Sequence, residues 1–281
     1  MTSTSRRLER AWIITPGLHR DRFTGAQQSG AAVAVVDIED SVAPADKQTA
    51  RTTSEAFFAL PDQPCILGIR MNSLTTLDGI KDLSALAAYT ARPDLIVIPK
   101  VESARDIELV AAALDTNDYT PDIWALIESP RAFTTLPAIM RAPRLGGVIF
   151  GSADYAASVR CGLSWEALHY ARSALINAAT AANLPAIDAP TWNLNDPDIL
   201  RRDAEQAKEL GFYGKGCVHP RHVQVINDVF TPTVDEITQA RAIVAAADAS
   251  GGTVTTVDGQ MRGTPFFNAA RALVAEADRT S

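Results

Sequence analysis

Short apolar runs alternate with longer amphipathic segments along most of this chain, and this alternation restricts its fold more than any other feature. Continuous apolar runs are typical of strands buried in a parallel sheet, and amphipathic segments are typical of the helices that cover it. The apolar runs are Ala11–Thr15, Ala32–Val36, Ile66–Ile69, Leu95–Ile98, Ile123–Ile127, Gly147–Phe150, Pro185–Ile187 and Gly214–Val218. The main amphipathic segments are Lys47–Leu60, Leu77–Tyr89, Ala104–Leu114, Trp165–Ala182 and Asp196–Leu210.

About eight such strand–helix units within 281 residues predict an α/β fold of the closed (β/α)8 barrel type, the TIM barrel. An open doubly wound sheet is the alternative, but no GxGxxG motif follows the first apolar run. Gly214-Lys215-Gly216 does not supply that motif, because Pro220 stands where its helix should already have begun. We therefore expect a barrel over residues 1–231.

The C-terminal residues 232–281 break the alternation. Pro232–Ala247 and Phe266–Ala277 have helical patterns, and Ser250-Gly251-Gly252 is typical of a linker. Between them, Val254–Gly263 is rich in turn residues and has some β character. These features predict a small, mainly helical appendage that follows the barrel.

Charge and cysteine content exclude several classes of protein. The chain has 26 Lys and Arg residues against 33 Asp and Glu residues, a net charge of −7, which argues against a nucleic-acid-binding surface. Its apolar runs are too short to span a membrane, and the polar segment Met1–Arg10 lacks the apolar stretch of a signal peptide. Three widely spaced cysteines without a CxxC pair are typical of a reduced, cytoplasmic protein.

Polar or charged residues follow almost every predicted strand. In a (β/α)8 barrel the C-terminal ends of the strands converge on one rim, where the active sites of such enzymes lie. A structural protein has no reason to gather so many groups that are costly to bury, so the pattern predicts an enzyme. These strand-end residues are Pro16-Gly17, Asp37, Glu39, Asp40, Arg70, Asn72, Pro99-Lys100, Glu128, Asp154, Asp188 and His219.

Glu128 and Asp154 follow two successive strands and are the strongest candidates for metal ligands. Several carboxylates at one rim repel each other unless a cation joins them. Hard oxygen ligands favour Mg2+ or Mn2+, and no cluster of Cys and His competes for zinc. For Asp40 and Asp188, a helix N-cap or a solvated loop charge is an equally open interpretation.

Arg70 and Lys100 end two further strands and are candidate anion-binding residues. A guanidinium at the end of a buried strand needs an anion, either a substrate carboxylate or one of the rim carboxylates. Lys100 could form a Schiff base, but the surrounding carboxylates should keep it protonated, and a protonated amine cannot attack a carbonyl. For His219, contact with substrate and a hydrogen-bonded structural role are both open.

Several short motifs occur in order between about Ala11 and Pro220. They are Val35-Val36-Asp37-Ile38-Glu39-Asp40-Ser41-Val42, Lys47 with Ala50-Arg51, Arg70-Met71-Asn72, Ile98-Pro99-Lys100-Val101-Glu102, Ile127-Glu128-Ser129-Pro130, Phe150-Gly151-Ser152-Ala153-Asp154-Tyr155 and Gly214-Lys215 with His219-Pro220. Any one of them is unspecific. The ordered set resembles the β-subunit of citrate lyase and its relatives, the malyl-CoA and citramalyl-CoA lyases of the metal-dependent pyruvate-aldolase superfamily.

This resemblance implies a Mg2+-dependent lyase or aldolase that makes or breaks a carbon–carbon bond beside a 2-keto acid. The substrate would be a small 2-keto acid or an acyl-CoA or acyl-carrier thioester. Residues 232–281 would form a C-terminal lid that reaches a neighbouring subunit, so a homo-oligomer, a trimer or hexamer, is expected. The implied roles are metal binding by Glu128 and Asp154, binding of the keto-acid carboxylate by Arg70, orientation of metal-bound waters by Asp37, Glu39 and Asp40, catalysis with Lys100, and substrate contact at Pro16 and Asn72.

The chain departs from its relatives at two places. It has Arg10-Ala11 where they have Arg-Ser, and it has Gly259-Gln260-Met261-Arg262-Gly263 where many CoA-using relatives read Gly-x-Met-Ile-Asp. The acid that acts on the thioester side is therefore missing. A citryl-, malyl- or citramalyl-type lyase is the leading hypothesis. The alternatives are a malyl-CoA-type thioester hydrolase, which the missing acid disfavours, and a lyase subunit that acts on a carrier-bound thioester.

Overall fold

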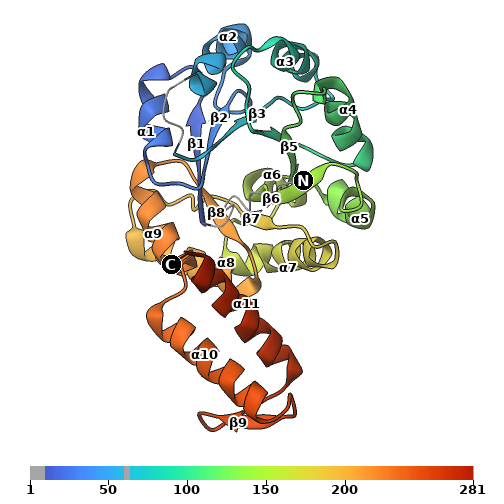
Figure 1. Cartoon of the computed structure of the whole chain (residues 1–281). Helices are drawn as coiled ribbons and strands as arrows, with labels where there is room; N and C mark the ends of the chain where they lie inside the picture. The colour runs from blue at the N-terminus through green and yellow to red at the C-terminus, as the bar shows by residue number, and fades with distance from the viewer. Residues whose placement is uncertain (1–9, 60–63, 281) are drawn as a thin grey trace. The chain divides into compact units, whose positions relative to one another are not determined.

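The computed structural model describes residues 10–59 and 64–280 (Figure 1). Leu60, the last residue of one predicted helix, and the segment before Arg10, in which no signal peptide is predicted, lie outside these residues. The chain divides into two compact units between Phe230 and Thr231. Each unit is described by itself.

The first unit is a closed barrel in which each strand is parallel to its neighbours, in the order β1 to β8. Figure 1 shows these strands encircled by helices. The (β/α)8 prediction is confirmed, and every predicted strand is present with its ends shifted by no more than two residues. The strands are β1 (Arg10–Pro16), β2 (Val33–Asp37), β3 (Ile66–Arg70), β4 (Leu95–Ile98), β5 (Asp122–Ile127), β6 (Leu145–Phe150), β7 (Ala186–Asp188) and β8 (Gly214–Cys217).

The helices of the barrel include all five that the amphipathic pattern predicted. The additional α5 and α6 begin directly after strand-end motifs, where short helices carry too few turns to show a clear period. The helices are η1 (Arg20–Arg22), α1 (Phe23–Gln27), η2 (Pro44–Asp46), α2 (Lys47–Phe58), α3 (Leu77–Ala88), α4 (Ala104–Leu114), α5 (Pro130–Ile139), α6 (Ser152–Val159), α7 (Trp165–Ala181), α8 (Pro197–Leu210) and α9 (Pro220–Phe230).

The strands bury apolar side chains on both faces, as continuous apolar runs predict. The outward-facing residues pack beneath the helices in the largest core cluster. A second cluster fills the interior of the barrel, where the rings of Trp12 and Trp124 lie 4.5 Å apart. Its other buried members are Val33, Val35, Ile66, Leu95, Val97, Leu126 and Ile187.

Strand register places the first site residues side by side. Pro16 on β1 is paired with Asp37 on β2, and Asp37 is paired with Arg70 on β3. The barrel closes where β8 meets β1, at Gly214 beside Arg10. A Cβ atom on Gly214 would lie 2.1 Å from the carbonyl oxygen of Arg10, so this close approach requires glycine.

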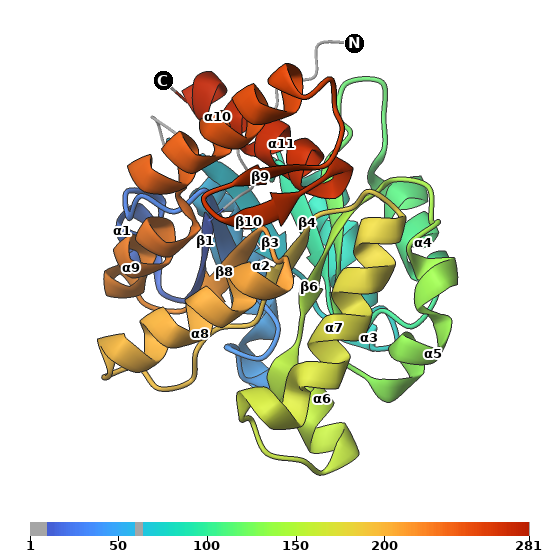
Figure 2. The ribbon, with the colours of Figure 1, turned by 90° about the horizontal axis from the view of Figure 1, so that it is seen from below.

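The second unit contains α10 (Val234–Ala249), α11 (Thr264–Thr280) and an antiparallel hairpin of β9 (Thr255–Val257) and β10 (Gln260–Arg262). The two helices pack through a small core that includes Ile243 and Phe267, and Figure 2 shows the hairpin beside them. Both predicted helices and the β character between them are confirmed. Across residues 10–59 and 64–280, none of the helices has the length and apolarity needed to cross a membrane.

Candidate active site

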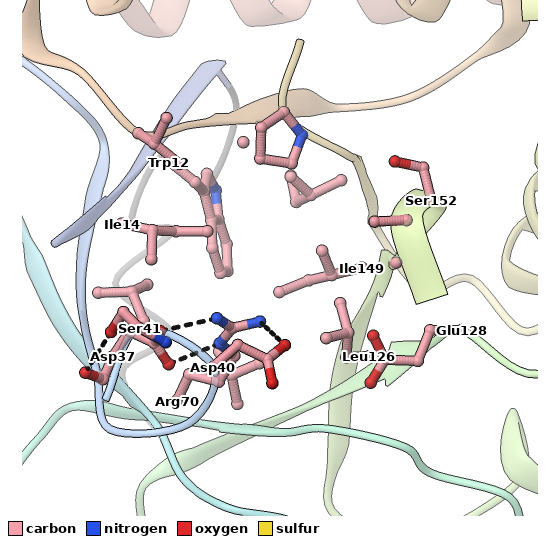
Figure 3. Close-up of a pocket in the computed structure, with 18 of the residues that line it drawn as sticks. Trp12, Ile14, Asp37, Asp40, Ser41, Arg70, Leu126, Glu128, Ile149 and Ser152 are labelled. Carbon is pink, nitrogen blue, oxygen red and sulfur yellow. Dashed lines mark hydrogen bonds and ion pairs between the residues drawn. The ribbon is translucent and has the colours of Figure 1, made fainter. Parts of the chain in front are cut away.

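A cavity of about 470 Å3 opens at the C-terminal ends of the barrel strands. Its floor and much of its wall are apolar side chains from the barrel interior, and Figure 3 shows Trp12, Ile14 and Ile149 around the hollow. Charged and polar groups from the strand-end motifs line its rim. These are Asp37, Asp40, Ser41, Arg70, Glu128, Ser152 and Asp154, together with Arg22.

Asp37 is buried and holds Arg70 in a fixed position. Its two oxygens accept from Nε and Nη2 of Arg70 at 2.7 and 2.8 Å, and they also accept from the backbone N–H groups of Glu39 and Ser41. Burial alone would raise the pKa of Asp37, but the charge and hydrogen bonds of Arg70 outweigh it and keep this pKa below its ordinary value. With these donors on both oxygens, Asp37 positions Arg70, and its expected role in orienting metal-bound waters stays a prediction.

Asp37 occupies Nε and Nη2 of Arg70, and Nη1 makes the remaining contacts. Its Nη1 lies 3.2 Å from Oε2 of Glu39 and 3.9 Å from Oδ2 of Asp40. Burial opposes its charge, but Asp37, Glu39 and Asp40 together raise the pKa of Arg70 above its ordinary value. Arg70 is therefore a permanent cation at the cavity, already paired on one side with Asp37. Its predicted contact with a substrate carboxylate stays a prediction.

Lys100 connects the other rim carboxylates. Its Nζ lies 2.9 Å from Oε1 of Glu39 and 3.9 Å from Oδ2 of Asp154, and its backbone N–H donates to Oε1 of Glu128 at 2.7 Å. Burial would lower the pKa of Lys100, but the hydrogen bond to Glu39 and the nearby carboxylates raise it. A lysine held protonated in this way is unsuited to imine formation.

Glu128 and Asp154 line the same cavity, and both lie beside Lys100. Glu128 accepts from the backbone N–H of Lys100, and Asp154 lies near its ammonium. Burial of Glu128, followed by the charges of Glu39 and Asp154, raises its pKa well above the ordinary value. Gly151, at the turn into α6, permits this arrangement, because a Cβ atom there would lie 2.4 Å from Oε2 of Glu128. The geometry thus concentrates negative charge beside an open space.

The donor set fits a hard divalent cation that completes its shell with waters and substrate. Within the part of the chain that the structure describes, no three His, Cys, Asp or Glu side chains form a metal site by themselves. Mg2+ is commonly held by one or two carboxylates plus substrate oxygens and waters, so Glu128 and Asp154 suffice. At the same rim, buried Oε2 of Glu39 accepts no well-aligned hydrogen bond from the described residues and has only its 3.2 Å ion-pair contact with Nη1 of Arg70.

Pro16 and Asn72, expected near the substrate, are placed differently. Pro16 lines the cavity. Asn72 is buried outside its lining and donates from Nδ2 to the carbonyl oxygen of Ile38 at 2.9 Å and to Asp82 at 2.6 Å. In the structure the amide of Asn72 supports the chain segment that carries Glu39, and its expected contact with substrate stays a prediction.

Asp188 belongs to a separate buried cluster. It pairs with Arg172 at 2.8 Å and with Lys215 at 2.7 Å, and Lys215 also lies 2.9 Å from Asp203. The sequence left open a rim carboxylate near a metal and a helix cap or solvated charge for Asp188, and in the structure it is instead part of a buried ion-pair cluster. The sequence pattern did not single out Lys215 as its partner.

Two residues that line the cavity had no signal in the sequence, Arg22 and Trp192, and a third, Ser152, was quoted only as part of a motif and given no role. They lie in loops or at helix starts, where no apolar period marks them. His219 is exposed and lines a neighbouring cavity of about 450 Å3 instead. Its Nδ1 accepts from the backbone N–H of Arg221, which is a local capping contact.

Comparisons with known proteins agree with this geometry. Residues 10–220 match the profile of the family described as HpcH/HpaI aldolase/citrate lyase, and residues 165–279 match that of a C–C bond lyase of the TIM-barrel fold. A (3S)-malyl-CoA thioesterase of Cereibacter sphaeroides is 31% identical over 277 residues, which cover 96% of this chain and 94% of that protein.

Two further relatives connect the chain to lyases. Citrate lyase subunit beta of Escherichia coli is 30% identical over 286 residues, covering 97% of this chain and 94% of that one. The crystal structure of CitE from Mycobacterium tuberculosis, in complex with magnesium, acetoacetate and coenzyme A, superposes with a TM-score of 0.84 at 26% identity. That comparison covers 97% of this chain and 99% of CitE.

Proposed function

The chain belongs to the HpcH/HpaI aldolase/citrate lyase family and is a carbon–carbon lyase of the oxo-acid type, and we propose that the cavity around Glu128, Asp154 and Arg70 is its active site. One observation carries the proposal. Two carboxylates, Glu128 and Asp154, and a guanidinium fixed by Asp37 line the same open cavity. This arrangement suits a 2-keto acid bound to a divalent cation.

Glu128 and Asp154 are the proposed ligands of Mg2+, with Mn2+ as a second suitable ion. The magnesium in the CitE complex supports this choice, as does the hard-oxygen donor set. When bound, Mg2+ would draw electron density from the keto-acid oxygens and so stabilise the enolate that forms as the carbon–carbon bond breaks.

The chain's own residues bind and orient the substrate. The Nη1 edge of Arg70, which also faces Glu39 and Asp40, pairs with the keto-acid carboxylate, and Asp37 holds the guanidinium in place. Burial and the charge of Asp40 raise the pKa of Glu39, although Arg70 and Lys100 oppose this shift. Glu39 is therefore the acid suited to hold a water or a proton. Lys100 fixes Glu39 through its ammonium and Glu128 through its backbone N–H.

Product release tests this function directly. The purified protein is incubated with Mg2+ and citryl-, malyl- and citramalyl-type substrates, as CoA thioesters and as free acids. We expect release of pyruvate, glyoxylate or oxaloacetate from at least one of them, and loss of this activity with EDTA. If no substrate yields a keto acid in the presence of Mg2+, the proposed function is wrong.

Thioester hydrolysis is the second candidate, because one relative is a (3S)-malyl-CoA thioesterase. The second unit argues against it, since Gly263 stands where CoA-using relatives carry an acid. Arg262 next to it donates to Gln260 at 2.6 Å and lies over the ring of Phe266. We expect weak or absent hydrolysis of malyl-CoA and citramalyl-CoA, and a gain with Gly263→Asp. Robust wild-type hydrolysis would contradict this expectation.

We also propose roles for the C-terminal residues, the oligomeric state, the form of the substrate and the location in the cell. Residues 232–281 would act as a lid over the active site of a neighbouring subunit in a trimer or hexamer. The substrate would carry CoA or a carrier protein, or would be a free keto-acid adduct. A cytoplasmic location agrees with the free thiols of Cys65, Cys161 and Cys217.

A further inference from the structure

Trp192 is a large aromatic residue, 50% exposed, that stands between two cavities. One is the proposed active-site cavity. The other has a volume of about 330 Å3 and lies among the starts of α7 and α8 and the β7–α8 loop. The two cavities share Ser152, Pro190 and Trp192 as lining residues, so these residues form the wall between them.

The indole of Trp192 is fixed beside the proposed metal site. Its Nε1 donates to Oγ of Ser152 at 3.1 Å, and Ser152 is buried at the start of α6 (Figure 3 shows Ser152 at the cavity). Ser152 precedes Asp154 by two residues on the same helix turn. The wall therefore lies beside the proposed metal ligand Asp154.

The loop that carries Trp192 is anchored on both sides. Oγ1 of Thr191 donates to Asp203 at 2.6 Å, and Nζ of Lys215 donates to the carbonyl oxygen of Ala189 at 2.7 Å. Beyond Trp192, the carbonyl oxygen of Leu194 accepts from Arg221. These contacts hold the backbone on both sides of Trp192, and the hydrogen bond to Ser152 orients the indole itself.

The second cavity can receive a polar or anionic group. Arg172 lines it with a side chain that is 4% exposed, and no described residue hydrogen-bonds to its Nη1. Arg202 adds a second guanidinium to the lining. Glu166 and Asp203 also lie there, but Asp203 is already engaged by Lys215 and Thr191. The guanidinium of Arg172 is engaged by Asp188 and lies over the ring of Trp165, so Arg202 is the cation of this lining that is open to a ligand oxygen.

We propose that Trp192 is a specificity-determining residue that limits how far a substrate can extend beyond its keto-acid half. The inference rests on the proposed function, since it assumes a keto acid bound between Glu128, Asp154 and Arg70. With the indole in place, the substrate is confined to the first cavity. Without it, the chain of a longer substrate enters the second cavity, where Arg202 meets a distal carboxylate.

Calorimetric titration with Mg2+ present tests this without requiring turnover. The probes are pyruvate, the six-carbon diacid 2-oxoadipate, and 2-oxohexanoate, which has the same chain length but no distal carboxylate. For Trp192→Ala we expect 2-oxoadipate to bind at least about ten-fold more tightly than to wild type, with pyruvate affinity changed by less than about two-fold. The gain for 2-oxohexanoate should be smaller, and Arg202→Gln in the Trp192→Ala background should remove part of the diacid gain.

Tyr170→Ala is the matched control, because Tyr170 is a 77% exposed aromatic on α7 outside both cavities. Trp192→Leu, a milder truncation, should give an intermediate gain and serves if the alanine variant does not fold. If the folded variants bind pyruvate normally and their affinity for 2-oxoadipate is unchanged, the inference about Trp192 is wrong but the proposed function is not. Absence of pyruvate binding by wild type would overturn the proposed function as well.

Discussion

Two groups of charged side chains lie at strand ends of the same barrel, and they differ in whether their charges are balanced. Around Asp188, two carboxylates face two cations, Arg172 and Lys215, and both Asp188 and Lys215 have fully buried side chains. At the cavity rim, five carboxylates lie with three cations, so negative charge is still in excess. The rim group consists of Asp37, Glu39, Asp40, Glu128 and Asp154 with Arg22, Arg70 and Lys100.

The difference separates a structural cluster from a binding site. Burial opposes ionisation of Asp188, but Lys215 and Arg172 outweigh it and lower its pKa. Burial also opposes ionisation of Glu128, and there Glu39 and Asp154 add to the effect and raise its pKa. A closed, balanced group needs no further partner, whereas an excess of negative charge beside a cavity favours a bound cation.

Glu128→Gln tests the rim most severely. It removes a proposed Mg2+ ligand while keeping its shape, and we expect kcat/KM to fall by at least about 1,000-fold. Stability without Mg2+ should not fall, because the change removes a carboxylate whose ionised form is disfavoured. Keto-acid release and urea unfolding measure the two effects. Mg2+-dependent activity close to wild type would exclude Glu128 as a ligand.

Asp188→Asn tests the balanced cluster and should act on stability instead. It leaves the buried cation Lys215 with one carboxylate fewer, and breaking a buried pair from one side costs about 3–5 kcal/mol. Asp228→Asn is the control, since Asp228 lies 4.0 Å from Arg201 on the surface, where such pairs contribute about 1 kcal/mol or less. Urea unfolding of both variants measures the contrast. Equal, small losses would show that the buried cluster is not a structural unit.

Arg70→Lys sharpens the comparison within the rim. It keeps the cation but loses the planar fork that Asp37 and the substrate carboxylate share, so we expect kcat/KM to fall by about 100-fold. Affinity for Mg2+ should stay near that of wild type, because Arg70 is not a proposed ligand. Steady-state kinetics and Mg2+ titration separate the two. Kinetics close to wild type would confine Arg70 to its ion pair with Asp37.

The sequence predicts the barrel and much of the rim because both depend on local pattern. Apolar runs mark the strands, and whatever follows a strand must lie at the rim, so the order of residues alone points to Glu128, Asp154 and Arg70. Their proposed roles in binding metal and substrate stay predictions. The charge state expected for Lys100 also follows from this crowding and agrees with its contacts to Glu39 and Asp154.

The local sequence pattern cannot predict which distant residue a strand-end side chain pairs with. Asp37 and Asp188 both end a buried strand, yet one holds Arg70, 33 residues away, and the other holds Lys215, 27 residues away. Asn72 also looks like a rim residue, but its amide is taken by Asp82 on α3. Trp192 lies in a loop without any period, so only the fold reveals that it separates two cavities.

The dependence of stability on pH gives the finest test of the balanced cluster. Because the pKa of Asp188 in the folded protein lies below its ordinary value of 3.8, ionised Asp188 stabilises the fold. This contribution is complete above the ordinary pKa and is lost as pH falls through the lowered one. The difference in unfolding free energy between wild type and Asp188→Asn should therefore be constant from about pH 5 to 8 and shrink below about pH 4. Urea unfolding across this range measures it, with Asp228→Asn again as the control. A difference that stays constant to the lowest pH at which the protein is folded would mean that the cluster stabilises through packing of Asp188 and not through its charge.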